Sequence, residues 1–169
     1  MPVFAIRRAT AADTLTLARH RAEMFRDMGE LSDDLADTLV EASRAYFARA
    51  IPEGRYVAWV AEAHDGGGEV IGGAGVQVRE LLPRPTPGGG GLLRGPQGLI
   101  LNVYTERAWR RRGVAEALMR ELLRWCRANG IESIVLHASD DGRPLYQKLR
   151  FVPTNEMRYQ GDRGDAASG

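Results

Sequence analysis

The sequence has little cysteine, no long hydrophobic run and almost no net charge. Its single cysteine, Cys126, excludes an internal disulfide framework and suits a reducing compartment. No apolar run approaches the roughly 20 residues that span a bilayer, and no charged start precedes an apolar segment. The net charge of +1 excludes a whole-molecule field that would attract nucleic acid or an anionic membrane. We therefore expect a cytoplasmic protein that binds neither nucleic acid nor a membrane.

The length of 169 residues predicts one domain, which we place at residues 1–160, followed by a small, polar and disordered tail at 161–169. Hydrophobic periodicity and turn residues predict an α/β fold in which strands alternate with helices. We expect strands at 3–7, 56–62, 70–78, 99–104 and 133–137, helices at 10–28, 32–51, 114–128 and 142–149, and a closing hairpin of 151–152 with 157–159.

Residues 82–98 form the one low-complexity segment, with Pro83, Pro85, Pro87 and four consecutive glycines at 88–91. Proline lacks a backbone N–H, so we expect this segment neither to pair into a sheet nor to continue a helix. Long loops beside a sheet are either binding lids or simple insertions, and the sequence leaves both open.

The segment from Trp109 to Ala115 lies between an apolar run and an amphipathic run, so it predicts a strand, an arginine-rich turn and then a helix. The first turn of a helix exposes unpaired N–H groups and carries partial positive charge. Gly113 lets the backbone approach a ligand, and Arg110, Arg111 and Arg112 add positive charge that suits phosphate oxygens. This turn therefore predicts a phosphate site.

Two motifs give the chain its resemblance to a known family. The turn reads Arg110-x-x-Gly113-x-Ala115, and about 35 residues later, beyond one helix and one strand, stands Leu145-Tyr146-x-Lys148-x-x-Phe151. Together they resemble the GNAT superfamily of acyl-CoA-dependent N-acetyltransferases. The resemblance implies a mixed, mostly antiparallel sheet with helices on both faces. It also implies that the fourth and fifth main strands, 99–104 and 133–137, splay apart.

The same resemblance implies acetyl-CoA as co-substrate and assigns residues to it. The N–H groups of Arg111 through Ala115 would hold the pyrophosphate. The strand end would pair with the pantetheine arm and polarise the thioester. Tyr146 would protonate the departing thiolate. The residues expected to bind acetyl-CoA are Val103, Tyr104, Thr105, Arg110, Arg111, Arg112, Gly113, Val114, Ala115 and Ser139.

Three positions depart from the family pattern. Arg150 replaces a glycine of the second motif, so the turn into the last hairpin must either differ or accept a non-glycine residue. Ser139 replaces an asparagine, and its shorter side chain reaches less far toward the pantetheine arm. Asn102 stands where many members have a glutamate, and an amide cannot act as a general base.

The sequence gives the fewest indications of which residues form the acceptor site and which residue acts as the general base. His20, Glu23 and Asp27 share one face of the first helix, in a region that borders the acceptor pocket in the family. His137 ends a predicted strand near Ser139. We carry Glu23, Asp27 and His137 as substrate-binding candidates, with solvated charges and a packed histidine as the ordinary alternatives. The histidines have no metal-ligand spacing, so we expect no metal site.

We therefore predict an N-acetyltransferase in which a neutral amine attacks acetyl-CoA directly, within a ternary complex. The alternative is a catalytically silent CoA-binding regulatory protein on the same fold. The amine can be a small molecule, an antibiotic, a peptide N-terminus or a protein lysine. Family members often pair, so a homodimer is one expectation, although no residue indicates it.

Overall fold

The computed structural model describes residues 3–161. The chain divides after His137 into two compact units, which are described separately below. The single domain predicted over 1–160 stays a prediction, and the predicted tail lies outside the described residues except for Gly161. Within residues 3–161, no helix combines the length and the apolar character needed to cross a bilayer.

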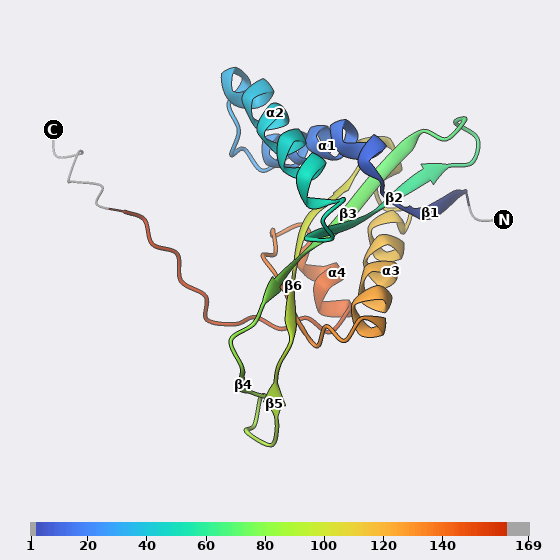
Figure 1. The fold of residues 1–169 in the computed structure, drawn as a ribbon. Helices are drawn as coiled ribbons and strands as arrows, with labels where there is room; N and C mark the ends of the chain where they lie inside the picture. The colour runs from blue at the N-terminus through green and yellow to red at the C-terminus, as the bar shows by residue number, and fades with distance from the viewer. Residues whose placement is uncertain (1–2, 162–169) are drawn as a thin grey trace, which may run out of the picture. The chain divides into compact units, whose positions relative to one another are not determined.

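The first unit is a five-stranded sheet with helices on both faces, as predicted. Its strands run in the order β1-β2-β3-β6-β7, antiparallel except for the parallel pair β6 and β7. Its other elements are the helices α1, α2 and α3 and a small ribbon of β4 and β5 (Figure 1). The bounds are β1 Phe4–Arg8, α1 Thr14–Asp27, α2 Asp33–Ala50, β2 Tyr56–Ala63, β3 Val70–Glu80, β4 Arg84–Pro85, β5 Leu92–Leu93, β6 Pro96–Thr105, α3 Val114–Ala128 and β7 Ser133–Leu136.

The β6 and β7 strands separate partway along their length. Their last pair is Ile100 with Leu136, and β6 then continues alone to Thr105. These are the fourth and fifth strands of the prediction, so the predicted splay is confirmed. An unpaired strand edge presents backbone N–H and C=O groups that another extended chain can use.

A bulge in β6 lies just beyond this separation. Gly73 pairs with Tyr104 and Gly75 with Leu101, so two steps along β3 face three steps along β6. Asn102 absorbs the extra residue with a left-handed φ of 62°. A bulge re-aims the backbone groups that follow it.

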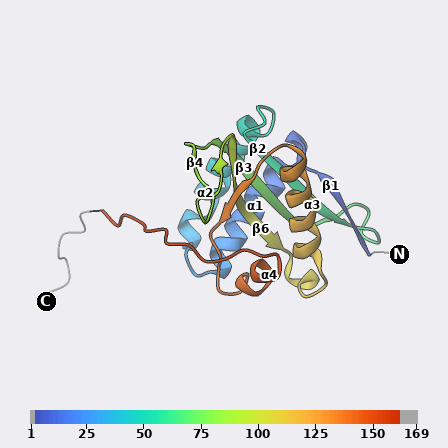
Figure 2. The same cartoon turned by 90° about the horizontal axis from the view of Figure 1, so that it is seen from below.

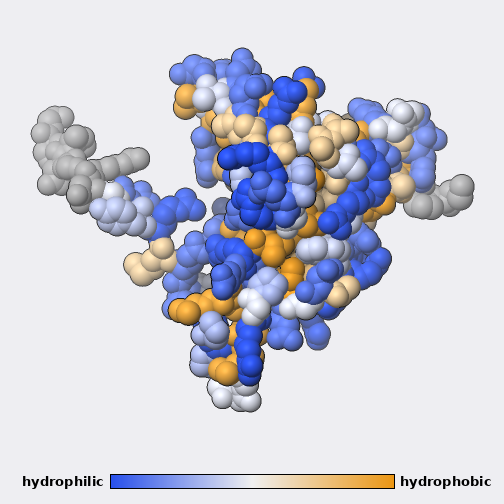
Figure 3. Space-filling view, viewed as in Figure 1, coloured by the Kyte–Doolittle hydropathy of each residue, from blue (hydrophilic) through white to orange (hydrophobic). Residues whose placement is uncertain are grey.

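Neighbouring glycines of β3 mark the two faces of the sheet. A Cβ on Gly72 would lie 3.0 Å from Val114 of α3, whereas one on Gly73 would lie 3.4 Å from Leu17 of α1. Alternate strand residues point to opposite faces, so α3 covers one face and α1 the other (Figures 1 and 2). α2 packs on the α1 side, because its Phe47 meets Tyr56 with ring centroids 4.9 Å apart. The outer surfaces of α1 and α2 are mostly hydrophilic (Figure 3).

Local signals set the ends of the helices. Thr10 and Asp13 form the expected capping box, which opens a short 3-10 turn, Ala11–Asp13, leading into α1. Gly29, with φ of 72°, ends α1: the N–H of Glu30 donates to the carbonyl of Phe25 at 2.9 Å.

The prediction that residues 82–98 cannot pair is wrong. β4 pairs with β5, and β6 begins at Pro96, opposite Glu80 of β3. The prolines are tolerated because Pro96 is the first residue of its strand and Pro85 lies in a two-residue ribbon, where one missing N–H costs little. The segment is therefore an extension of the β3–β6 hairpin that carries a small second ribbon.

In its described residues, 138–161, the second unit contains one helix, α4, with bounds Arg143–Lys148. The predicted closing hairpin is wrong, because residues 151–161 have no regular secondary structure. Strands of two and three residues offer few backbone pairs to offset the entropy of ordering them, and Pro153 lacks an N–H. Arg150 takes a left-handed φ of 72° as α4 ends, so of the two expected outcomes the turn accepts a non-glycine residue.

Candidate active site

The arginine turn has the backbone geometry of an open helix N-terminus. Arg111 and Gly113 both have left-handed φ, 64° and 80°, and α3 begins at Val114. The first backbone N–H of this segment with an acceptor is that of Ala117, which donates to Gly113 at 3.0 Å. Among residues 3–161, no group accepts a hydrogen bond from the N–H groups of Arg111 through Ala115. Five neighbouring donors are therefore available to an anion.

Arg110 is fixed by the protein itself. Its Nε donates to the Thr105 carbonyl at 3.0 Å, and its guanidinium reaches the Asp27 carboxylate at 2.5 Å. Arg107 donates to the other Asp27 oxygen at 2.7 Å. Hydrogen bonds from Arg107 and Arg110 lower the pKa of Asp27. Asp27, predicted as a substrate contact, thus anchors the turn to α1.

The two following arginines, Arg111 and Arg112, are both exposed. Arg112 lies over the Trp109 ring, 5.2 Å from its centroid. Neither forms an ion pair with a carboxylate in the described part of the chain. Both are therefore available to supply positive charge beside the five N–H groups.

The end of β6 carries the residues predicted to meet the pantetheine arm. Val103, Tyr104 and Thr105 follow the bulge and lie on the part of β6 that has left β7. The Thr105 Oγ1 atom is buried and has no hydrogen-bond partner in the described residues. A buried polar atom without a partner costs free energy, so a ligand group that reached it would recover that cost.

A buried histidine and a glutamate meet at this strand end. The His20 ring packs against Tyr104 with centroids 4.9 Å apart and the rings tilted by 35°, and its Nε2 lies 3.4 Å from an oxygen of Glu106. Burial lowers the pKa of His20 to about 4, so the imidazole is neutral at pH 7. Burial also raises the pKa of Glu106, which makes it a stronger base than an exposed glutamate. Sequence reasoning missed Glu106, because 86 residues separate it from His20.

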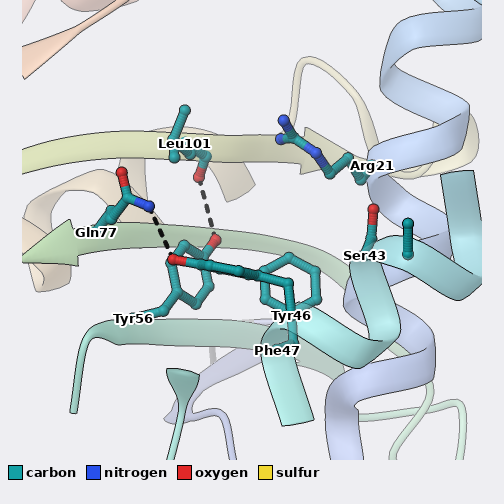
Figure 4. Close-up of a pocket in the computed structure, with 8 residues that line it drawn as sticks. Arg21, Ser43, Tyr46, Phe47, Tyr56, Gln77 and Leu101 are labelled. Carbon is teal, nitrogen blue, oxygen red and sulfur yellow. Dashed lines mark hydrogen bonds between the residues drawn. The ribbon is translucent and has the colours of Figure 1, made fainter. Parts of the chain in front are cut away.

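A cavity of about 290 Å³ opens on the α1 and α2 side of the sheet. Gln77 Nε2 donates to the Tyr46 hydroxyl at 2.8 Å, and the Tyr56 hydroxyl donates to the Leu101 carbonyl at 3.5 Å (Figure 4). Burial raises the pKa of Tyr56. The full lining is Arg21, Ala42, Ser43, Tyr46, Phe47, Tyr56, Gln77 and Leu101. None was predicted, since their spacing along the chain resembles ordinary core periodicity.

Two further acceptor-site candidates lie elsewhere in the first unit. Glu23 receives a hydrogen bond from Arg26 at 2.7 Å on the exposed side of α1. His137 is exposed and follows the last residue of β7. The structure brings neither into the cavity lining.

The second unit holds the predicted acid and its neighbours. Ser139 Oγ accepts a hydrogen bond from the Gly142 N–H at 3.2 Å. The Tyr146 ring lies against Gly142, where a Cβ would come within 2.7 Å of it, and 6.2 Å from the Phe151 ring. Burial raises the pKa of Tyr146, so its phenol keeps its proton at neutral pH.

Comparison with known proteins agrees with this architecture. The model of the Acetyltransferase (GNAT) family matches residues 19–151. The chain is similar to a GCN5-related N-acetyltransferase from Ralstonia eutropha JMP134, with 31% identity and a TM-score of 0.81 over 92% of this chain and 97% of that one. No curated protein sequence matches it.

Two more solved structures extend the comparison. A predicted acetyltransferase from Clostridium acetobutylicum, solved with acetyl-CoA, has 27% identity and a TM-score of 0.74 over 92% of this chain and 94% of that one. An aminoglycoside acetyltransferase from an uncultured soil metagenomic sample has 22% identity and a TM-score of 0.69 over 92% and 95%, and so shares the fold. With most of its length matched, the chain belongs to the GNAT family of acetyltransferases, whose acetyl donor is acetyl-CoA.

Proposed function

We propose that this protein transfers the acetyl group of acetyl-CoA to an amine by direct attack within a ternary complex. The observation that carries the proposal is the run of five backbone N–H groups, Arg111 to Ala115, that have no acceptor in residues 3–161. Family membership and the bound acetyl-CoA of the Clostridium acetobutylicum relative support it. A single cysteine and the acetyl donor suit a reaction in the cytoplasm.

In this proposal the turn and the strand edge hold the donor together. The five N–H groups bind the pyrophosphate, and Arg111 and Arg112 add charge beside its oxygens. Val103, Tyr104 and Thr105 pair with the pantetheine arm as an added strand, and a free N–H there stabilises the oxyanion. Ser139 is a further contact to the arm.

The chemistry needs one base and one acid. The amine nitrogen forms a bond to the acetyl carbon while the carbon–sulfur bond breaks. The amine loses its proton to a base, and the thiolate gains one from an acid. We assign the acid to Tyr146 and the base to Glu106, whose pKa is raised by burial. Asn102 is excluded as a base, because it is an amide and its Nδ2 donates to the Leu17 carbonyl at 3.0 Å.

The test measures donor binding and turnover in separate experiments. Calorimetry should detect acetyl-CoA binding, and a thiol assay should detect CoA release in the presence of a suitable amine. Gly113→Val should abolish binding, because a β-branched side chain disfavours the left-handed backbone of the turn. Gly130→Val is the matched control, since Gly130 has φ of 71° at the other end of the same helix. Equal affinity of both variants would remove the turn from the site.

The acid assignment has its own test. Tyr146→Phe should lower kcat by roughly 100-fold, the usual contribution of a general acid, and leave acetyl-CoA affinity nearly unchanged. Full turnover in a reaction limited by chemistry would contradict the assignment.

Acetyl-CoA binding with no turnover across a broad amine panel would instead favour a catalytically silent CoA-binding protein. This alternative is supported by Asn102, which stands where many members of the family have a glutamate.

A further inference from the structure

The cavity on the α1 and α2 side is built to hold a small molecule with an apolar body. Aromatic rings of Tyr46, Phe47 and Tyr56 form its walls, and the polar groups among them are already fixed by the bonds from Gln77 and to Leu101 (Figure 4). Its volume, about 290 Å³, lies at the small end of the range for ligand pockets. This size favours a single small molecule over a peptide or an oligosaccharide.

Arg21 brings the one formal charge to this lining. Its guanidinium lies 4.9 Å from the centroid of the Phe25 ring, and its side chain lines the cavity (Figure 4). Among residues 3–161, no Asp or Glu lies within ion-pair distance of it. Arg26 on the same helix shows the usual situation, since it pairs with Glu23 at 2.7 Å.

Leaving Arg21 without a carboxylate costs free energy. Burial lowers the pKa of the Arg21 guanidinium, which means that the charged form is poorly solvated there. Arg21 is half-buried, and a charge partly removed from water is ordinarily paired, because its desolvation is otherwise not offset. A carboxylate on a ligand would supply the missing partner, and guanidinium binds carboxylate through two parallel hydrogen bonds.

The cavity also touches the strand of the proposed reaction. Leu101 of β6 lines it and immediately precedes the bulge that leads into Val103, Tyr104 and Thr105. A molecule that filled the cavity would therefore lie on the strand that we propose carries the thioester.

We propose that this cavity is the acceptor site and that the acceptor is an apolar amino acid, whose carboxylate pairs with Arg21. This inference rests on the proposed acetyl transfer, to which it adds the substrate class. The amine nitrogen of the amino acid forms the new bond to the acetyl carbon as the carbon–sulfur bond breaks. The product is an N-acetyl amino acid that keeps its carboxylate on Arg21.

The experiment compares acceptors that differ only in the carboxylate. CoA release is measured with L-phenylalanine and L-leucine and with their carboxamides. We expect kcat/KM to be at least 10-fold higher for the acids, since a charge-assisted pair contributes on the order of 10- to 100-fold. Arg21→Met should remove this preference by raising KM for the acids, with the carboxamides changed less than about twofold. Arg21→Lys should restore part of it. Arg19→Met, an exposed arginine of the same helix, should change neither.

The results separate the possible failures. Equal kcat/KM for acids and carboxamides, or an equal loss for both in Arg21→Met, would overturn the inference and leave acetyl transfer standing. Turnover of simple amines but of no amino acid would do the same. Acetyl-CoA binding with no CoA release for any amine, amino acids included, would overturn both. A second readout is calorimetry of N-acetyl-L-phenylalanine and its amide on the CoA complex, where equal affinity would also overturn the inference.

Discussion

The two faces of the central sheet differ in whether the side chains that they bury are polar. On the α3 face, Trp59 and Trp125 pack edge to face with centroids 5.8 Å apart, and the Arg8 guanidinium covers both rings. The helix adds a row of fully buried apolar residues, Leu118, Met119, Leu122 and Cys126. The α1 face instead buries His20 and Asn102, and each has one atom without a hydrogen-bond partner in the described residues.

This contrast separates stability from function within one sheet. The row of buried residues on the α3 face is apolar, so burial and close packing stabilise it. The α1 and α2 side contains the cavity, an arginine with no ion-pair partner in residues 3–161 and a neutral buried histidine, all of which reduce stability. Costly polar features of this kind collect at functional sites. Substitutions on the two faces should therefore have different consequences.

The largest expected effect is on the α3 face. Leu118→Ala removes a fully buried side chain that packs on β3 at Gly72, and should lower the free energy of unfolding by about 4 kcal/mol. Urea unfolding would measure this. Acceptor selectivity, measured below the unfolding transition, should stay unchanged. A decrease in the free energy of unfolding of less than about 1 kcal/mol, or a changed acceptor selectivity, would contradict the proposal that the α3 face serves stability and the α1 face serves function.

The buried histidine should make the α1 face sensitive to acid. The pKa of His20 is about 4 in the folded chain and near 6.5 when unfolded, so below pH 6.5 only the unfolded chain gains a proton. Stability should therefore fall by about 3 kcal/mol as the pH drops from 6.5 to 4. His20→Phe should flatten this part of a stability profile, whereas His64→Ala, at an exposed site, should not. Identical slopes for both variants would contradict this account of His20.

Gly75 tests whether the cavity depends on close packing. A Cβ at this position would overlap the hydroxyl end of Tyr56, so Gly75→Ala must displace the ring, at a cost of about 2 kcal/mol. We expect acceptor KM to rise while acetyl-CoA affinity is unchanged. Gly73→Ala is the control on the same strand, since its Cβ would make contacts of 3.4 Å. Equal kinetic effects of the two changes would argue against the cavity as acceptor site.

The smallest effect concerns the hydrogen bond from Gln77 to Tyr46. Tyr46→Phe removes the acceptor and should cost about 1 kcal/mol of stability. A double-mutant cycle with Gln77→Ala would isolate the pair, and a coupling free energy near zero would show that the bond does not help to shape the cavity.

Local motifs were readable from the sequence because their causes lie close together along the chain. The capping box of Thr10 and Asp13 spans four residues, and the turn at Arg110 to Ala115 spans six. The order of the main strands and helices followed from hydrophobic periodicity together with the family resemblance. At Arg150 the sequence predicted either a different turn or one that accepts a non-glycine residue, and the left-handed φ of Arg150 corresponds to the second.

Long-range features could not be predicted in the same way. Glu106 lies beside His20, which is far from it in the sequence. Arg21 lines the same cavity as Gln77 and Leu101, which come from other parts of the chain. Each arrangement depends on how α1 and α2 dock on the sheet, which local sequence patterns do not encode. The proline and glycine content of residues 82–98 did not prevent strand pairing, because that pairing tolerates proline at strand starts and in a short ribbon.

The most direct test of the central claim is a crystal structure of this protein with acetyl-CoA. The account predicts that the diphosphate oxygens lie about 3 Å from the backbone nitrogens of Arg111 through Ala115 and that the thioester lies beside β6. A diphosphate held away from this turn, with those five N–H groups still without an acceptor, would contradict it.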